Sequence, residues 1–143
     1  GDVYKRQLYE FMNTVGEEPT IIKMDVEGYE YEIISGNRNF LCEIKPEIFM
    51  EFHGHILGLD RSIRLLKMLE SCGYRLAGAY SDMDTFVYNF PKSFRRIFVP
   101  VYRRIFKTRH AGIGRLPFRS FSDIIQNFKE EYPWCMGLHL VAD

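Results

Sequence analysis

The chain has 143 residues, of which 46% are hydrophobic and 15% aromatic, so it is long and apolar enough to bury a core as one domain. This composition excludes a disordered chain, and the apolar runs fall short of the roughly 20 residues that a transmembrane helix needs. Nineteen basic and nineteen acidic residues cancel. Their distribution along the chain is uneven, however, which suggests an anionic partner for one segment.

The first seven residues, GDVYKRQ, resemble read-through from a sequencing adapter, and we expect a non-native head there. The fold is therefore interpreted from residues 8–143. Three cysteines, Cys42, Cys72 and Cys135, show neither metal-ligand nor paired spacing, and their odd number leaves one over. We expect reduced thiols in a cytoplasmic protein.

The first predicted elements are a helix, a strand and a second helix. Apolar residues at helical spacing predict a short helix over 8–15. The run 20–24, TIIKM, consists mostly of strand-forming residues and predicts a buried parallel strand that ends at Asp25. From Val26 the apolar spacing becomes helical, and Gly36 is placed to end that helix.

The pattern of strand and helix then repeats. A polar link over 37–45 leads to a predicted strand at 47–52, which ends in polar residues. Asp60 is a candidate N-cap for a helix that Gly73 ends, and residues 74–80 predict a third strand. Such alternation implies parallel strands joined by right-handed crossovers, and hence an α/β fold.

The C-terminal part interrupts this alternation. We interpret residues 82–119 as an insertion within the domain. Ser120 or Ser122 can cap a helix that follows it. The alternating residues 136–142 predict a last strand, either inside the sheet or paired in a hairpin.

The insertion is basic, with no acidic residue between Thr85 and Ser122. Its nine basic residues are Lys92, Arg95, Arg96, Arg103, Arg104, Lys107, Arg109, Arg115 and Arg119. The rest of the chain is left with ten basic and nineteen acidic residues. Apolar residues at helical spacing lie between the arginine pairs, which predicts an amphipathic basic helix that kinks or restarts at Pro100.

Three interpretations of this basic segment stay open. It is a helix packed on the domain with a solvated basic face, a membrane-surface helix on anionic lipid, or a recognition element for an anionic substrate. The residues that would meet the anion are Arg95, Arg96, Arg103 and Arg104. We expect no nucleic-acid partner, because the rest of the chain is acidic and the single tryptophan lies elsewhere.

Acidic residues gather where the first two predicted strands end. Asp25, Glu27 and Glu30 follow the first strand, and Glu51 stands at the end of the second. Ligands of open α/β sheets bind outside the carboxyl ends of the strands. Neighbouring carboxylates there can orient a hydroxyl, take its proton or hold a divalent ion. Asp25 can equally be an N-cap, and Glu27 and Glu30 also suit the positive end of a helix dipole.

Two histidines, His53 and His55, follow Glu51 at alternate positions. If the strand continued through Gly54, the three side chains could share one side and hold a metal ion. A histidine after a strand is more often simply hydrogen-bonded. We therefore predict no metal site.

Two segments carry a family resemblance. KMDVEGYEYEIISG at 23–36 and PEIFMEFHG at 46–54 resemble, in order and spacing, the signature of FkbM-type S-adenosylmethionine-dependent methyltransferases. The resemblance extends over residues 8–80. It implies the C-terminal portion of a class I methyltransferase fold, with a Rossmann-like doubly wound sheet. It also implies methyl transfer from S-adenosylmethionine to a hydroxyl of a small-molecule or glycan acceptor, such as a sugar or a secondary metabolite.

The resemblance implies catalytic roles for Asp25, Glu27, Glu51 and His53, the last of which falls on the family's own histidine position. The family's glycine-rich cofactor loop is not found in the chain, so no cofactor-binding residue is identified. We expect a partial domain that is inactive on its own, and a truncated gene would explain both this and the unusual head. The alternative is a non-catalytic α/β module that docks on a membrane surface or an anionic partner through its basic segment.

Overall fold

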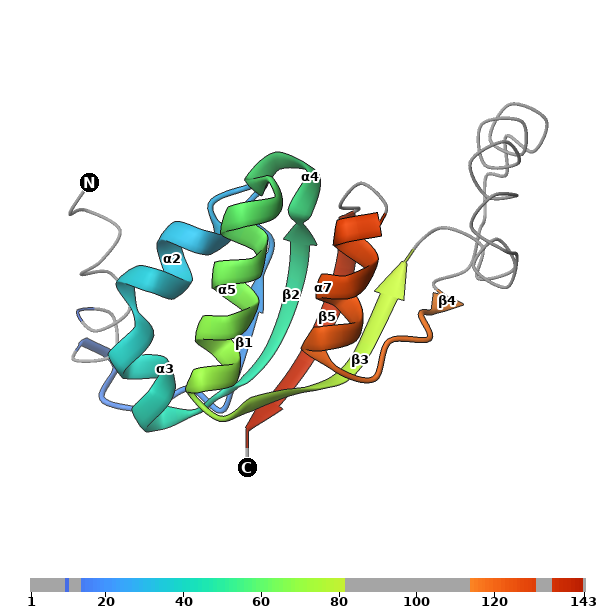
Figure 1. Cartoon of the computed structure of the whole chain (residues 1–143). Coiled ribbons are helices and arrows are strands. Elements are labelled where there is room, and N and C mark those ends of the chain that lie inside the picture. Colours follow the sequence, from blue (N-terminus) through green and yellow to red (C-terminus); the bar gives the residue numbers. More distant parts are fainter. Residues whose placement is uncertain (1–9, 11–13, 82–113, 131–134, 143) are drawn as a thin grey trace, which may run out of the picture.

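A computed structural model describes residues 10, 14–81, 114–130 and 135–142 (Figure 1). Its five strands form one mixed sheet in the order β1-β2-β5-β3-β4. The strands are β1 (Ile21–Met24), β2 (Glu47–His53), β3 (Tyr74–Ser81), β4 (Gly114–Arg115) and β5 (Cys135–Ala142). Strands β1 and β2 are parallel, and β5 lies antiparallel between β2 and β3. Consequently β1, β2 and β3 all run in the same direction.

The described helices cover one face of this sheet, as Figure 1 shows. They are α2 (Glu30–Gly36), α3 (Arg38–Ile44), α4 (Gly54–Leu57), α5 (Leu59–Ser71) and α7 (Phe121–Glu130). Side chains alternate between the two faces of a strand, and every second residue of β2 is buried on the helical side: Ile48, Met50 and Phe52. These side chains share one core with the buried apolar residues of α5, which are Leu65, Leu66 and Leu69.

The predicted alternation of strands and helices is confirmed. The three predicted strands at 20–24, 47–52 and 74–80 are present within one residue of their expected bounds and are parallel. Gly73 ends α5 with a positive φ of 85°, as a helix-stopping glycine should. The resulting mixed α/β architecture is compatible with a Rossmann-like fold.

The helix predicted from Val26 begins four residues later, at Glu30. The intervening residues form a turn in which Glu27 and Gly28 both have positive φ, 45° and 101°. A right-handed helix cannot run through two such residues. Within the described chain no side chain caps α2, and Asp25 is exposed ahead of this turn, so the N-cap interpretation of Asp25 is wrong.

The polar link predicted over 37–45 is instead largely the helix α3. Its Phe40 and Leu41 are buried in the core, and Lys45 ends it in the left-handed conformation. The helix has seven residues and begins with polar ones, so its apolar residues span about one turn. This is too short for a helical repeat to be recognised in the sequence. Residue Asp60, predicted as an N-cap, lies inside the first turn of α5, which begins one residue earlier.

The last helix begins where the sequence places it. The Ser120 hydroxyl accepts a hydrogen bond from the Asp123 amide at 3.1 Å, and the Asp123 carboxylate accepts one from the Ser120 amide at 3.0 Å. This reciprocal arrangement is a capping box at the start of α7. Of the predicted insertion, only residues 114–119 are described. The arginine pairs and the proposed amphipathic helix lie outside the described residues.

Cys42 and Cys72 form a disulfide that joins α3 to the end of α5. The expectation that no two cysteines pair is therefore wrong for these two, which are 30 residues apart in sequence. The strand β2 and helix α5 lie between them in the chain, so only the packing of α3 on α5 brings the sulfurs together. No helix in the described part of the chain is long and apolar enough to cross a membrane.

Next to this disulfide, Tyr74 begins β3 and is buried. Its hydroxyl donates a hydrogen bond to the Pro46 carbonyl oxygen at 2.9 Å. Burial raises the pKa of Tyr74 to about 12, because the charged phenolate would lose its hydration. The hydroxyl therefore stays a hydrogen-bond donor at all physiological pH values and links β3 to the start of β2.

Candidate functional site

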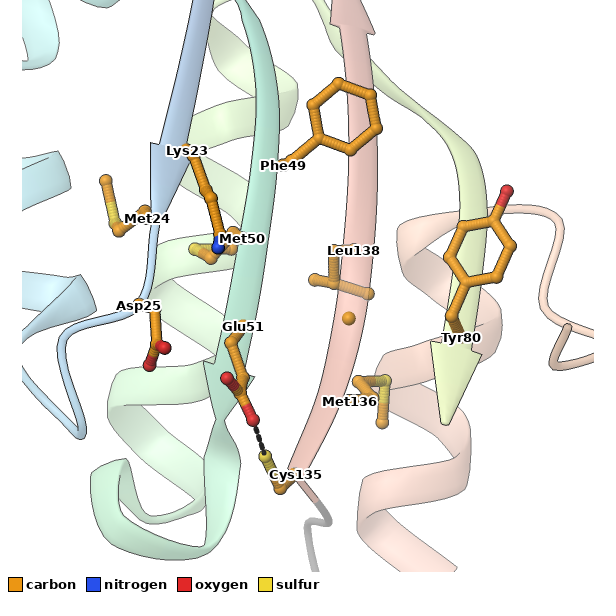
Figure 2. A pocket seen from close by; sticks show the side chains of 11 residues that line it. Lys23, Met24, Asp25, Phe49, Met50, Glu51, Tyr80, Cys135, Met136 and Leu138 are labelled. Carbon is orange, nitrogen blue, oxygen red and sulfur yellow. Dashed lines mark hydrogen bonds between the residues drawn. The ribbon is translucent and has the colours of Figure 1, made fainter. Parts of the chain in front are cut away.

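A hollow of about 500 Å³ lies on the sheet face that carries none of the described helices. It is centred on the carboxyl ends of β1 and β2 and the first residues of β5 (Figure 2). Its lining residues are Lys23, Met24, Asp25, Phe49, Met50, Glu51, Tyr80, Cys135, Met136, Gly137 and Leu138. The hollow therefore occupies the place where open α/β sheets bind their ligands.

Asp25 and Glu51 lie side by side at this edge of the sheet. Met24 pairs with Met50 in the parallel register, so Asp25 and Glu51 are the next residues of two adjacent strands. Both are exposed, and Figure 2 shows both carboxylates at the wall of the hollow. The structure thus brings together the two acids that the sequence places at the two strand ends.

Cys135 approaches Glu51 from the neighbouring antiparallel strand. The register of β2 and β5 pairs His53 with Cys135, which sets the cysteine across from the end of β2. The Cys135 thiol donates a hydrogen bond to Glu51 Oε1 over 3.2 Å. A thiol and a carboxylate therefore share one side of the hollow, as the dashed line in Figure 2 marks.

Beneath these two side chains lies a buried pair, His53 and Glu30. The exposed fractions of the two residues are 7% and 0%. His53 Nδ1 is 2.5 Å from Glu30 Oε1, and the Gly28 amide donates to the same oxygen over 3.2 Å. A carboxylate oxygen only accepts hydrogen bonds, so Nδ1 carries the proton.

The other ring nitrogen of His53 faces Glu51. Nε2 lies 3.9 Å from Glu51 Oε1. With Nδ1–H donated to Glu30, Nε2 of the neutral ring keeps its lone pair and can accept a proton or bind a metal. Glu30, His53 and Glu51 therefore form a connected series from the buried core to the hollow.

Two other predicted positions, Glu27 and His55, are not brought to this site. Glu27 is exposed on the left-handed turn before α2 and does not line the hollow. His55, weighed as a third metal ligand with Glu51 and His53, is exposed on α4, and its ring centroid is 6.0 Å from that of His53. The arginines proposed to contact an anion lie outside the described residues.

Sequence reasoning missed Glu30 as the partner of His53 and Cys135 as the neighbour of Glu51. Glu30 was grouped with Asp25 and Glu27 as an acid after the first strand or near a helix start, and Cys135 carried no local signal. Strand alternation could have placed Lys23, Phe49 and Glu51 on one face, because they occupy alternate positions of adjacent strands. Cys135 could not be found this way, since its neighbours follow from the insertion of β5 between β2 and β3.

The same sheet face continues past the hollow with a second His–Glu contact. His139 Nε2 is hydrogen-bonded to Glu47, and the His139 ring stacks on Phe49 with 4.3 Å between ring centroids. This contact fixes the Phe49 ring, which forms part of the lining. The hollow is thus bounded by an ordered aromatic side chain on one side and by carboxylates on the other.

A comparison with protein families identifies the Methyltransferase FkbM domain over residues 2–76. The match spans slightly more than half of the 143-residue chain and includes β1, β2 and the residues Asp25, Glu30, Glu51 and His53. Comparisons with curated proteins and with solved structures find no match. The family match confirms the resemblance inferred from the two sequence segments, and the chain belongs to the FkbM methyltransferase domain family.

Proposed function

We propose that the protein transfers a methyl group from S-adenosylmethionine to a hydroxyl of a sugar or secondary metabolite, and that the hollow holds this acceptor. Membership of the FkbM methyltransferase domain family supports methyltransferase activity. The observation that carries the proposal is the pair of adjacent carboxylates, Asp25 and Glu51, at the wall of a hollow of about 500 Å³. Their place at the carboxyl edge of the parallel strands is where such folds bind substrates.

The lining fits a hydroxyl-bearing acceptor of modest size. Carboxylates only accept hydrogen bonds, so Asp25 and Glu51 select a ligand that donates them. The remaining wall is largely apolar and includes the rings of Phe49 and Tyr80. Ligand sites of this kind combine apolar walls with a few placed polar groups, which orient the ligand.

Oxygen methylation requires the acceptor hydroxyl to be aligned and to lose its proton. S-adenosylmethionine, when bound, supplies the electrophilic methyl group. Asp25 and Glu51 orient the hydroxyl by accepting its hydrogen bond, and Glu51 is the residue that takes the proton. His53 stabilises this protonated state, because its Nε2 faces Glu51 while Glu30 holds its Nδ1–H.

We assign none of the described residues to the methyl donor. The described residues contain no glycine-rich strand-to-helix loop that could bind the adenosyl and methionine parts of S-adenosylmethionine. The proposal therefore concerns the acceptor side of the reaction. The test is a methyl-transfer assay on the full-length protein with labelled S-adenosylmethionine and a panel of sugars and secondary-metabolite alcohols.

In that protein, Asp25→Asn and Glu51→Gln should each lower kcat by roughly tens-fold or more, because a group that positions or deprotonates the acceptor typically contributes about 10²–10⁴-fold. The melting temperature should stay unchanged, since both side chains are exposed. Glu70→Gln, an exposed acid on α5 away from the hollow, is the matched control and should keep full activity. Unchanged turnover in either site variant would contradict the proposed roles.

A further inference from the structure

The side chains at the inner end of the hollow form a second kind of site, which shares Glu51 and His53 with the methyl-transfer proposal and adds Cys135. Glu51, His53 and Cys135 each offer one ligand atom, and these atoms all lie within 4.8 Å of one another. The Glu51 Oε1 atom is 3.2 Å from Cys135 Sγ and 3.9 Å from His53 Nε2. Three different donor types, oxygen, sulfur and nitrogen, therefore converge from two adjacent strands.

These separations are close to those around a tetrahedral ion. Zinc binds oxygen and nitrogen at about 2.0–2.1 Å and thiolate sulfur at about 2.3 Å, so neighbouring ligand atoms lie roughly 3.3–3.6 Å apart. The two distances that involve Glu51 differ from this range by a few tenths of an ångström, and the third pair, Cys135 Sγ and His53 Nε2, lies within 4.8 Å. A small rotation of the exposed Glu51 side chain adjusts the first two distances, and the partly exposed Cys135 side chain must turn toward His53 to adjust the third.

The histidine is already held as a metal ligand requires. Metal-binding histidines usually donate their second ring N–H to a carboxylate, which fixes the ring and the tautomer. His53 Nδ1 has this partner in Glu30 Oε1 at 2.5 Å, in a fully buried position. The Gly28 amide holds the same oxygen in place. The Nε2 lone pair consequently points toward Glu51 with no reorganisation of the buried pair.

We infer that Glu51, His53 and Cys135 bind a divalent zinc-like cation, with Glu30 as the positioning residue behind His53. The mixed donor set favours zinc or cobalt over magnesium and calcium, which prefer oxygen ligands alone. Binding replaces the thiol proton: Cys135 loses H⁺ to solvent and binds as thiolate. The two charges of the cation are then balanced by the Cys135 thiolate and the Glu51 carboxylate.

Three protein ligands leave a fourth tetrahedral position, the arrangement found in catalytic rather than structural zinc sites. Glu51 and Cys135 both line the hollow, so the ion lies at its wall. A water molecule or an acceptor hydroxyl can complete the coordination. Coordination of an acceptor hydroxyl as the fourth ligand rests on the proposed function. Cation binding by the three protein residues does not depend on it.

Cobalt titration of the metal-stripped protein tests the site directly. The protein is treated with a chelator, kept in a phosphine reductant and titrated with Co²⁺, without S-adenosylmethionine or any acceptor. We expect one cobalt per chain, the strong visible bands of tetrahedral cobalt and a thiolate-to-cobalt charge-transfer band. Added Zn²⁺ should displace the cobalt and remove these bands.

Four variants assign the ligands. Cys135→Ser should abolish the charge-transfer band, and Glu51→Gln should weaken cobalt binding. Glu30→Gln should weaken binding by about 10–100-fold while leaving the charge-transfer band unchanged at saturation, because Glu30 acts only through His53. His55→Ala, which changes a nearby exposed histidine outside the cluster, should bind cobalt as the parent does. Circular dichroism of each variant confirms that it is folded.

A double variant, Cys42→Ser with Cys72→Ser, controls for the other two sulfurs and should retain the charge-transfer band. The inference is overturned if no stoichiometric cobalt binding occurs, or if the charge-transfer band survives in Cys135→Ser. Loss of binding in folded His55→Ala would equally overturn it. Failure of methyl transfer leaves these outcomes unchanged, since the titration contains neither donor nor acceptor, and so the two proposals fail separately.

Discussion

The buried Glu30 carboxylate contributes to stability only as long as its hydrogen-bond donors are in place, and His53 is its one side-chain donor. Glu30 is fully buried, and its Oε1 receives hydrogen bonds from the Gly28 amide and from His53 Nδ1. Its Oε2 has no hydrogen-bond partner among the described residues. A carboxylate in this position depends on His53, because no water replaces a lost donor in the core.

We therefore expect His53→Ala to lower the free energy of unfolding by about 1–3 kcal/mol or more, the range for leaving a buried group without its hydrogen-bond donor, which is larger for a charged group. The double variant with Glu30→Gln should recover part of this loss, since the amide carries no charge. Urea denaturation of the two single variants and the double variant measures the coupling.

The matched control is the exposed ion pair of Arg61 and Glu32, whose nitrogen and oxygen are 2.7 Å apart. Arg61→Ala should cost less than about 1 kcal/mol, because both side chains remain hydrated. If His53→Ala were as mild as this control, the buried pair would contribute nothing particular to stability.

At the scale of elements, the turn between β1 and α2 positions two site residues, Asp25 before it and Glu30 after it. Gly28 has a positive φ of 101°, and an added Cβ would lie 2.5 Å from Ile56 Cγ2 on α4. The turn is therefore packed against the helix that follows His53. This close approach places Asp25 and Glu30 on either side of the turn while keeping Glu30 against His53.

Gly28→Ala should consequently destabilise the protein by more than Gly16→Ala. Both glycines have positive φ, but a Cβ at Gly16 would meet no atom within 4 Å. We expect about 1 kcal/mol for the backbone strain alone at Gly16, and a further 1–3 kcal/mol at Gly28 from overpacking. Chemical denaturation of both variants measures the difference.

Shortening Ile56 provides a second check on the cause. In the background of Ile56→Ala, the extra cost of Gly28→Ala should largely vanish, because the contacting methyl group is gone. If Gly28→Ala lowered the free energy of unfolding equally with and without Ile56→Ala, the strain would lie in the backbone of the turn and not in its contact with the helix.

At the scale of the whole molecule, charge is divided between an acidic body and the basic segment at 92–109, which lies outside the described residues. The sequence predicts that this segment attracts anionic surfaces. Each basic residue near a membrane contributes about 1 kcal/mol, and the attraction is screened over a Debye length of about 8 Å at physiological salt.

We expect the protein to sediment with vesicles that contain anionic lipid and to be released by high salt. Changing Arg95, Arg96, Arg103 and Arg104 together to Gln should abolish the sedimentation. The matched control changes four exposed basic residues of the helical face to Gln: Arg38, Arg61, Arg64 and Lys67. Equal loss in both variants, or no binding to anionic vesicles at low salt, would contradict attachment through this segment.

The local patterns of the sequence were sufficient for the parallel strands, for α5 and for the start of α7, where Ser120 was one of two candidate caps. Each depends on residues close in sequence: alternation in β2, a four-residue apolar spacing in α5, and Ser120 with Asp123 at the start of α7. The start of α2 and the existence of α3 were missed. Both are short, and the positive φ values that delay α2 leave little trace in composition.

The sequence by itself indicated that Asp25 and Glu51 would lie at the same edge of the sheet, because parallel strands end at one edge and each acid ends its strand. The tertiary structure then made them neighbours by pairing β1 with β2. The sequence determined the family as well, through two segments that are each local. Only the tertiary structure decided that β5 enters between β2 and β3, which places Cys135 beside Glu51, and that Cys42 meets Cys72. These contacts join residues 30 to 84 positions apart. These contacts form because the elements that carry them pack around one hydrophobic core. The spacing of residues within each element does not indicate which distant elements will pack together.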